Sequence, residues 1–81
     1  MEKTLRSAEY MRLVALLVDA RRKAGVRQQA LAKRLGKPQS FVAKYEGGER
    51  RLDVVEFITI AQALDADAVR LFRRFVQGRK R

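Results

Sequence analysis

Apolar residues in the first third of the chain recur at the three- and four-residue spacing of a single helix face. This spacing predicts a helix over about residues 7–24 that buries one side. Its stripe consists of Tyr10, Leu13, Val14, Leu17, Ala20 and Ala24. Arg21 falls on the same stripe, where a single charge is costly unless a carboxylate pairs with it. A buried acidic partner for Arg21 is therefore expected.

A tight break follows in the middle of the chain. Gly36 suits the left-handed position past a helix end, and Pro38 suits the first turn of a new helix. We therefore expect two short helices, over about residues 28–35 and 38–46, joined by a short turn.

The second of these short helices buries little. Val42 and Tyr45 share one face, and Glu46 lies one helical turn after Val42 on the same side. Glu46 is therefore the expected partner of Arg21. Phe41 lies at the boundary of this face and could also be a core aromatic. The opposite side carries the small or polar residues Gln39, Ser40, Ala43 and Lys44.

Two more helices are predicted in the second half of the chain. Asp53 followed by Glu56 is a capping-box arrangement that starts a fourth helix. Either Asp65 or Asp67 caps a fifth helix, which runs to about Gln77. The stripe of the fourth helix consists of Val54, Phe57, Ile58, Ala61 and Leu64.

The fifth helix has more apolar surface than one buried face requires. Val69, Phe72 and Val76 fall together, and Leu71 with Phe75 falls on another side. One set can cover the core, and the other marks an interface unless both wrap into the core. We assign Leu71, Phe72 and Phe75 to the expected interface.

Length and composition restrict the class of protein. The 81 residues are enough for one compact all-α domain, residues 1–81, with frayed ends over about residues 1–6 and 78–81. Cysteine and histidine are both absent, so thiol nucleophiles, the commonest general base and the usual nitrogen or sulfur metal ligands are missing. We therefore expect no catalytic residue, no metal and no cofactor. No secretory signal or membrane span is visible, which favours a cytoplasmic protein.

Charge is unevenly distributed along the chain. The formal net charge is +10, and residues 21–51 alone hold ten basic residues against Glu46 and Glu49, a net charge of +8. Residues 52–69 hold four acidic residues and no basic one, and residues 70–81 hold six basic residues and no acidic one. Segregation of this kind indicates an anion-facing surface rather than mere solubility, and a polyanion is the expected partner.

The two short helices together form a helix-turn-helix that can enter a DNA major groove. The outward residue types of the second short helix suit this task. Glutamine can pair with adenine, lysine can reach guanine, serine is adaptable, and an aromatic edge can touch a thymine methyl group. The flanking arginines and lysines are expected to contact phosphates.

The stretch VRQQALAKRLGKPQSFVAKYEGGERRLDVVEFITIAQAL resembles the XRE-type helix-turn-helix proteins, the Cro and phage-repressor class. The resemblance follows a pattern of Gln, Leu-Ala, Leu-Gly, Gln-Ser-Phe-Val and Glu at fixed offsets and covers about residues 10–64. It implies a compact five-helix lambda-repressor-like domain, a motif at about residues 28–46, and dimeric, sequence-specific binding of double-stranded DNA.

The resemblance also implies roles for individual residues. It makes Gln28 a phosphate or base contact, and it pairs Arg21 with Glu46 as a structural ion pair. The expected base-reading residues are Gln39, Ser40, Phe41 and Lys44. The expected DNA-backbone contacts are Arg27, Gln28, Gln29, Lys37, Arg50 and Arg51. Arg27 replaces the usual hydroxyl cap of its helix, Lys37-Pro38 replaces an apolar-hydroxyl pair, and Glu49 stands where a base is frequent.

The sequence thus predicts a prokaryotic or phage-type, nucleoid-associated regulator. It binds an inverted repeat as a homodimer, with its third helix, over about residues 38–46, in the major groove. A few side chains on one recognition helix cannot select one promoter from a genome, and a dimer doubles the site. The alternative is an antitoxin or anti-activator that binds a protein partner through helix five and regulates its own operon. The operator and the sign of regulation stay open.

Overall fold

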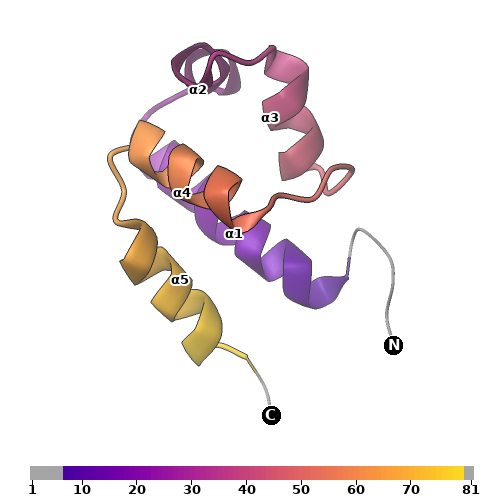
Figure 1. Cartoon of the computed structure of the whole chain (residues 1–81), viewed down its shortest axis with the longest axis vertical. Coiled ribbons are helices and arrows are strands. Elements are labelled where there is room, and N and C mark those ends of the chain that lie inside the picture. Colours follow the sequence, from indigo (N-terminus) through magenta and orange to yellow (C-terminus); the bar gives the residue numbers. More distant parts are fainter. Residues whose placement is uncertain (1–6, 80–81) are drawn as a thin grey trace.

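Five α-helices are present in residues 7–79, the part of the chain that this computed structural model describes (Figure 1). They are α1 (Ala8–Lys23), α2 (Gln28–Leu35), α3 (Gln39–Glu46), α4 (Val54–Ala63) and α5 (Ala68–Gln77). The predicted all-α, five-helix fold is confirmed. Of the ends predicted to fray, residues 1–6 and 78–81, residues 1–6 and 80–81 lie outside the described residues, whereas Gly78 is the C-cap of α5 and Arg79 forms an ion pair with Glu9. Within residues 7–79 no helix is long and apolar enough to cross a lipid bilayer.

Local sequence signals account for the ends of α2 and α3. Gly36 closes α2 in the left-handed conformation, with φ of 66°, which glycine adopts without strain. Pro38 is the N-cap of α3, so this helix begins at Gln39, one residue later than predicted. The turn between the two helices is therefore as tight as the sequence indicated.

The remaining helix starts are capped by side chains. Ser7 Oγ accepts a hydrogen bond from the Tyr10 N–H at the start of α1. Asp53 and Glu56 form the predicted reciprocal capping box of α4. Of the two candidate caps for α5, Asp67 is the one used, because its carboxylate accepts from the Arg70 N–H.

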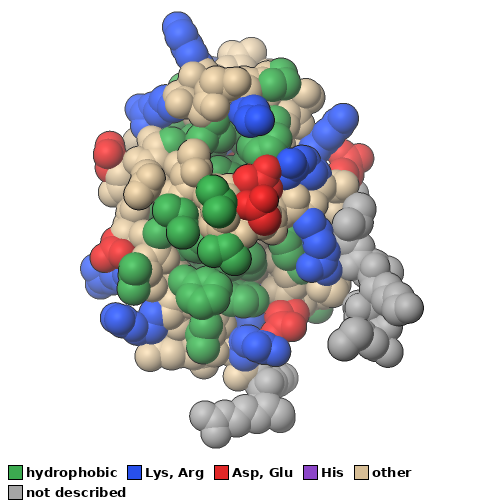
Figure 2. Space-filling model, viewed as in Figure 1, with side chains coloured by type: hydrophobic (Ala, Val, Ile, Leu, Met, Phe, Trp, Pro, Cys, Tyr) green, Lys and Arg blue, Asp and Glu red, His purple; other side chains and the backbone are tan. Residues whose placement is uncertain are grey.

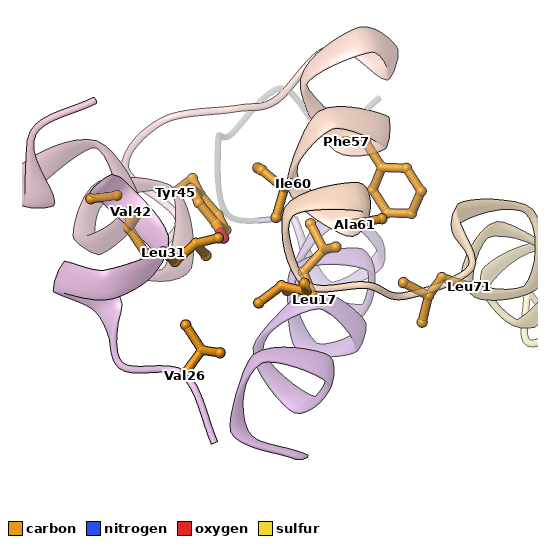
Figure 3. Close-up of a cluster of buried hydrophobic side chains, with 11 residues drawn as sticks. Leu17, Val26, Leu31, Val42, Tyr45, Phe57, Ile60, Ala61 and Leu71 are labelled. Carbon is orange, nitrogen blue, oxygen red and sulfur yellow. The ribbon is translucent and has the colours of Figure 1, made fainter. Parts of the chain in front are cut away.

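The core lies where α1 to α4 meet, and α5 closes it on one side (Figure 3). Leu17, Leu31, Val42 and Tyr45 are completely buried, with no exposed surface. Burial of each such side chain contributes about 1.5–3 kcal/mol of hydrophobic free energy. The single inward face of α3 is thus fully used by Val42 and Tyr45, which fixes the rotation of this helix about its axis.

The two ends of the molecule differ in what they carry. In Figure 1, α2 and α3 lie together at one end of the long axis, α1 and α4 cross in the middle, and α5 lies at the other end. The molecule measures 37 × 25 × 20 Å. The helix-turn-helix is therefore well separated from α5.

One sequence prediction for α5 is wrong. Leu71, assigned to an exposed interface, is only 7% exposed and belongs to the core, whereas Phe72 is 47% exposed. The physical reason is the anchoring of α5 on α1. The Arg12 guanidinium lies over the Phe75 ring at 5.3 Å and donates to the Phe75 carbonyl oxygen. Gly78 has no side chain to obstruct this contact, since a Cβ there would collide with Arg12.

Candidate nucleic-acid interface

The outer face of α3 is polar and open to solvent. Gln39, Ser40 and Lys44, three of the four residues predicted to read bases, are exposed, as is Ala43 between them. Val42 and Tyr45 on the opposite face are completely buried. The helix is therefore held firmly from beneath while its outer side chains stay available for an external partner.

Phe41, the fourth predicted base-reading residue, is half-buried at the edge of this face. Its ring meets the Tyr45 ring edge-on, with centroids 5.7 Å apart. Two cations flank it: Lys37 Nζ lies 5.6 Å and the Arg50 guanidinium carbon 4.8 Å from the ring centroid. Phe41 thus bridges the outer face of α3 and the loop that follows this helix.

A largely buried ion pair fastens α3 to α1. The structure brings Arg21 and Glu46 together: Arg21 Nε donates to Glu46 Oε2 at 2.6 Å and Nη2 donates to Oε1 at 3.0 Å. Arg21 Nη1 also donates to the Val26 carbonyl oxygen at 2.9 Å. The two side chains are only 12% and 8% exposed. The hydrogen bond that Arg21 donates to Glu46 raises the pKa of Arg21 above its ordinary value.

Gln28 extends this pair into a network that reaches the outer face of α3. Its Nε2 donates to Glu46 Oε1 at 2.8 Å, and its Oε1 accepts from Gln39 Nε2 at 3.4 Å. The predicted phosphate or base contact is therefore also an internal bridge. Sequence patterns could not reveal this bridge, because it depends on how α2 and α3 pack. It joins Gln28 at the start of α2 to both ends of α3, Gln39 and Glu46.

The other predicted backbone contacts surround the start of α2 and the turn. Arg27, Gln29 and Lys37 are all exposed. Arg27 is the N-cap of α2 and makes no side-chain capping bond, as expected for a residue that cannot accept one. These side chains lie on the segments that begin α2 and lead into α3.

The loop between α3 and α4 holds the last two predicted contacts. Arg50 forms a two-pronged ion pair with Glu56. Arg51 lies over the Tyr10 ring at 4.5 Å. The Tyr10 hydroxyl donates to the Arg50 carbonyl oxygen and accepts from the Leu52 N–H, at 3.3 and 3.0 Å. The backbone of this loop is thus fixed to α1.

The Arg50–Glu56 pair is the part of the site that sequence reasoning missed. The hydrogen bond from Arg50 lowers the pKa of Glu56 below its ordinary value, and a second one from the Asp53 N–H adds to this. The same pair raises the pKa of Arg50. The capping box with Asp53 already accounted for Glu56 in the sequence. Its pairing with Arg50 therefore left no further pattern from which it could be predicted.

Comparison with known proteins agrees with this geometry. Residues 17–71 match the helix-turn-helix family. A solved XRE-family-like protein from Pseudomonas syringae pv. tomato is 46% identical, with a TM-score of 0.83, over 86% of this chain and 85% of its own. The restriction-modification controller protein C.AhdI from Aeromonas hydrophila is 30% identical, with a TM-score of 0.73, over 82% of this chain and 100% of its own. Among curated proteins no significant match is found.

The family match and both structural matches include the motif formed by α2 and α3 and the helices that support it. They confirm the lambda-repressor-like architecture, and the family consists of DNA-binding regulators rather than enzymes. The chain belongs to the XRE-type helix-turn-helix family of DNA-binding transcriptional regulators.

Proposed function

We propose that this regulator reads a specific DNA sequence by placing α3 in the major groove. The observation that carries the proposal is the division of α3 into a completely buried face and an exposed polar face. Gln39 and Lys44 supply the donors and acceptors that distinguish base edges, Ser40 adapts to either type, and the Phe41 edge suits a thymine methyl group. DNA binding of this kind places the protein in the prokaryotic cytoplasm, where the nucleoid lies.

Phosphate contacts are proposed for the exposed residues around α3. Arg27, Gln29, Lys37 and Arg51 stand on the segments that flank the recognition helix. The excess of basic residues between positions 21 and 51 supports this role, because such side chains replace counterions condensed on DNA. Gln28 reaches the DNA together with Gln39, to which it is hydrogen-bonded.

We further propose that two copies bind an inverted repeat as a homodimer. The support is an exposed apolar face on α4 and α5, over which hydrophobic side chains gather in Figure 2. Its exposed members are Val54, Ile58, Val69, Phe72 and Val76. A groove of about 210 Å³ runs between Ile58 and Phe72. Related by a two-fold axis, two such faces set the recognition helices about 34 Å apart, one turn of DNA.

Selection of bound sequences from a random DNA pool tests the reading function. We expect an enriched inverted repeat, with an affinity that falls by about three to five decades between 50 and 200 mM salt. The salt slope reports the phosphates neutralised by the dimer. A pool that stays random after several rounds, or an affinity indifferent to salt, contradicts the proposal.

Sedimentation of Phe72→Glu tests the dimer. The substitution places a charge on the apolar face, so the protein should stay helical, become monomeric and lose its preference for the inverted repeat. Gln62→Glu is the control, because it adds a negative charge at an exposed position of α4 that lies outside the groove and away from Phe41. A wild-type monomer at about tens of micromolar that still binds one half-site tightly contradicts the dimer. Such a monomer would favour a different protein on this face.

A further inference from the structure

Arg50 has most of its bonding capacity occupied inside the protein. Its Nη1 and Nη2 donate to the two carboxylate oxygens of Glu56, at 3.1 and 2.8 Å. Nη1 also donates to the Arg51 carbonyl oxygen at 2.9 Å. The Phe41 ring lies against the guanidinium, 4.8 Å from its central carbon. A phosphate would have to displace Glu56 to use the Nη1–Nη2 fork, so that only the Nε side of the guanidinium is left to it.

Glu56 is itself a fixed partner. Its Oε1 accepts from the Asp53 N–H at 2.9 Å, and the Asp53 carboxylate accepts from the Glu56 N–H at 2.7 Å. The carboxylate is therefore tied to the first turn of α4. Through Glu56, the Arg50 guanidinium is therefore held by α4, a packed helix, as well as by its own loop.

The Phe41 ring packs against the core on one side and faces open space on another. The ring borders a cavity of about 170 Å³ that Val55 and Thr59 of α4 also line. Tyr45 touches the ring edge-on from below, while Lys37, at 5.6 Å, stands on a flexible stem in the turn. The guanidinium held by Glu56 lies closer to the ring, with its central carbon 4.8 Å from the centroid.

We propose that Arg50 is a positioning residue for base reading rather than a phosphate contact. Its ion pair with Glu56 holds the guanidinium against Phe41, and this contact sets the aromatic edge that α3 presents to the bases. The inference rests on the proposed function of α3 and replaces the phosphate role that the sequence predicted for Arg50. It also means that the positive charge of Arg50 is largely balanced within the protein.

Two conservative variants of the full chain separate the alternatives. Arg50→Lys keeps the charge but loses the fork and the flat face. Glu56→Gln removes the ion pair yet keeps an oxygen that can complete the capping box. Glu49→Gln is the matched control, because it removes one exposed carboxylate from the loop that carries Arg50. Affinity is measured on the selected inverted repeat and on a scrambled duplex, over a range of salt.

The expected result is a loss of discrimination without a loss of general affinity. Arg50→Lys and Glu56→Gln should each weaken binding to the selected site by about tenfold, the scale of one misplaced base contact. For Glu56→Gln, the affinity for the scrambled duplex and the salt slope should match those of Glu49→Gln. For Arg50→Lys, both should match those of wild type. In a Phe41→Leu background, Arg50→Lys should have no further effect on discrimination, because the ring through which Arg50 acts is gone.

The opposite pattern overturns the proposal. If Arg50 binds phosphate and Glu56 restrains it, Glu56→Gln tightens both duplexes beyond the effect of Glu49→Gln, and Arg50→Lys leaves discrimination unchanged. An Arg50→Lys effect that persists in full without Phe41 also contradicts it. Failure of the underlying function is distinguishable, because the wild-type protein itself would then show no preference between the two duplexes.

Discussion

Two arginine–glutamate pairs flank α3, and they differ in setting more than in geometry. Both join a guanidinium to the two oxygens of one carboxylate. The side chains of Arg21 and Glu46 are 12% and 8% exposed, whereas those of Arg50 and Glu56 are 43% and 25% exposed. The Arg21–Glu46 pair, the inner pair, docks α3 on α1. The Arg50–Glu56 pair, the outer pair, connects the loop after α3 with α4.

The comparison shows that ion pairs of similar geometry have different roles depending on how deeply they are buried. Breaking a buried pair leaves a charge without solvent, so its cost appears as lost stability. An exposed pair contributes little to stability because water and salt screen it. Its value lies in where it holds its members, here Arg50 against Phe41. Substitutions distinguish these two roles: a change in the Arg21–Glu46 pair alters stability, whereas a change in the Arg50–Glu56 pair alters the position of Phe41.

The largest expected effect is on the inner pair. Glu46→Ala leaves the Arg21 side chain, which is 12% exposed, with the Val26 carbonyl oxygen as a remaining acceptor. We expect a loss of about 3–5 kcal/mol in the free energy of unfolding, as for other buried pairs that lose one partner. Urea unfolding measures it, with Glu49→Ala as the control on an exposed glutamate of the following loop. An unchanged midpoint for Glu46→Ala would mean that this pair does not hold α3 on α1.

The two pairs also differ in how far the sequence could predict them. Arg21 was identifiable because a charge on an apolar stripe demands a partner, and only Glu46 fell on the matching side of α3. Glu56 already had a local explanation as the third helical residue after Asp53. Its contact with Arg50 depends on how the loop folds back over Phe41, which no periodicity encodes.

The same limit explains the error on α5. Periodicity showed two apolar sides but did not decide which one faces the core. In the structure Leu71 packs into the core, and Arg12 covers Phe75 and bonds to its carbonyl oxygen next to Gly78. Helix ends, by contrast, followed local signals, and Gly36 closes α2 and Asp53 caps α4 as these signals predicted.

A middle-sized effect is expected at the anchor of the outer pair's loop. Tyr10→Phe removes the hydroxyl that accepts from the Leu52 N–H and donates to the Arg50 carbonyl oxygen. Tyr10 is 6% exposed, so loss of these bonds should lower the free energy of unfolding by about 1–3 kcal/mol. Amide hydrogen exchange at Leu52 should accelerate more than exchange within α1. Equal acceleration in both places would show general destabilisation rather than release of the loop.

A smaller effect of opposite sign is expected beside the inner pair. The Tyr45 hydroxyl is buried and makes no hydrogen bond within residues 7–79, and burial raises its pKa. Tyr45→Phe removes this unsatisfied group and leaves the ring contacts with Phe41 in place. We expect a gain of about 1 kcal/mol in stability, since an unpaired buried hydroxyl costs free energy. Thermal melting that falls by several degrees would instead show that the hydroxyl is hydrogen-bonded in solution.

The smallest expected effect is the pH dependence of the outer pair. The hydrogen bond from Arg50 lowers the folded-state pKa of Glu56 below its ordinary 4.5. A carboxylate with a depressed pKa adds stability above its unfolded-state pKa and loses this contribution as pH falls through the folded-state value. Wild type should therefore melt above Glu56→Gln at neutral pH, and the gap should close as pH falls below 4.5. Because the pair is exposed, the gap should be small and should shrink further in high salt.

Arg50→Gln provides the control, since without the guanidinium the same Glu56→Gln substitution should produce a weaker pH dependence. A gap that widens on acidification would mean that Arg50 does not stabilise the ionised form of Glu56, and the contact proposed to position Phe41 would lose its anchor.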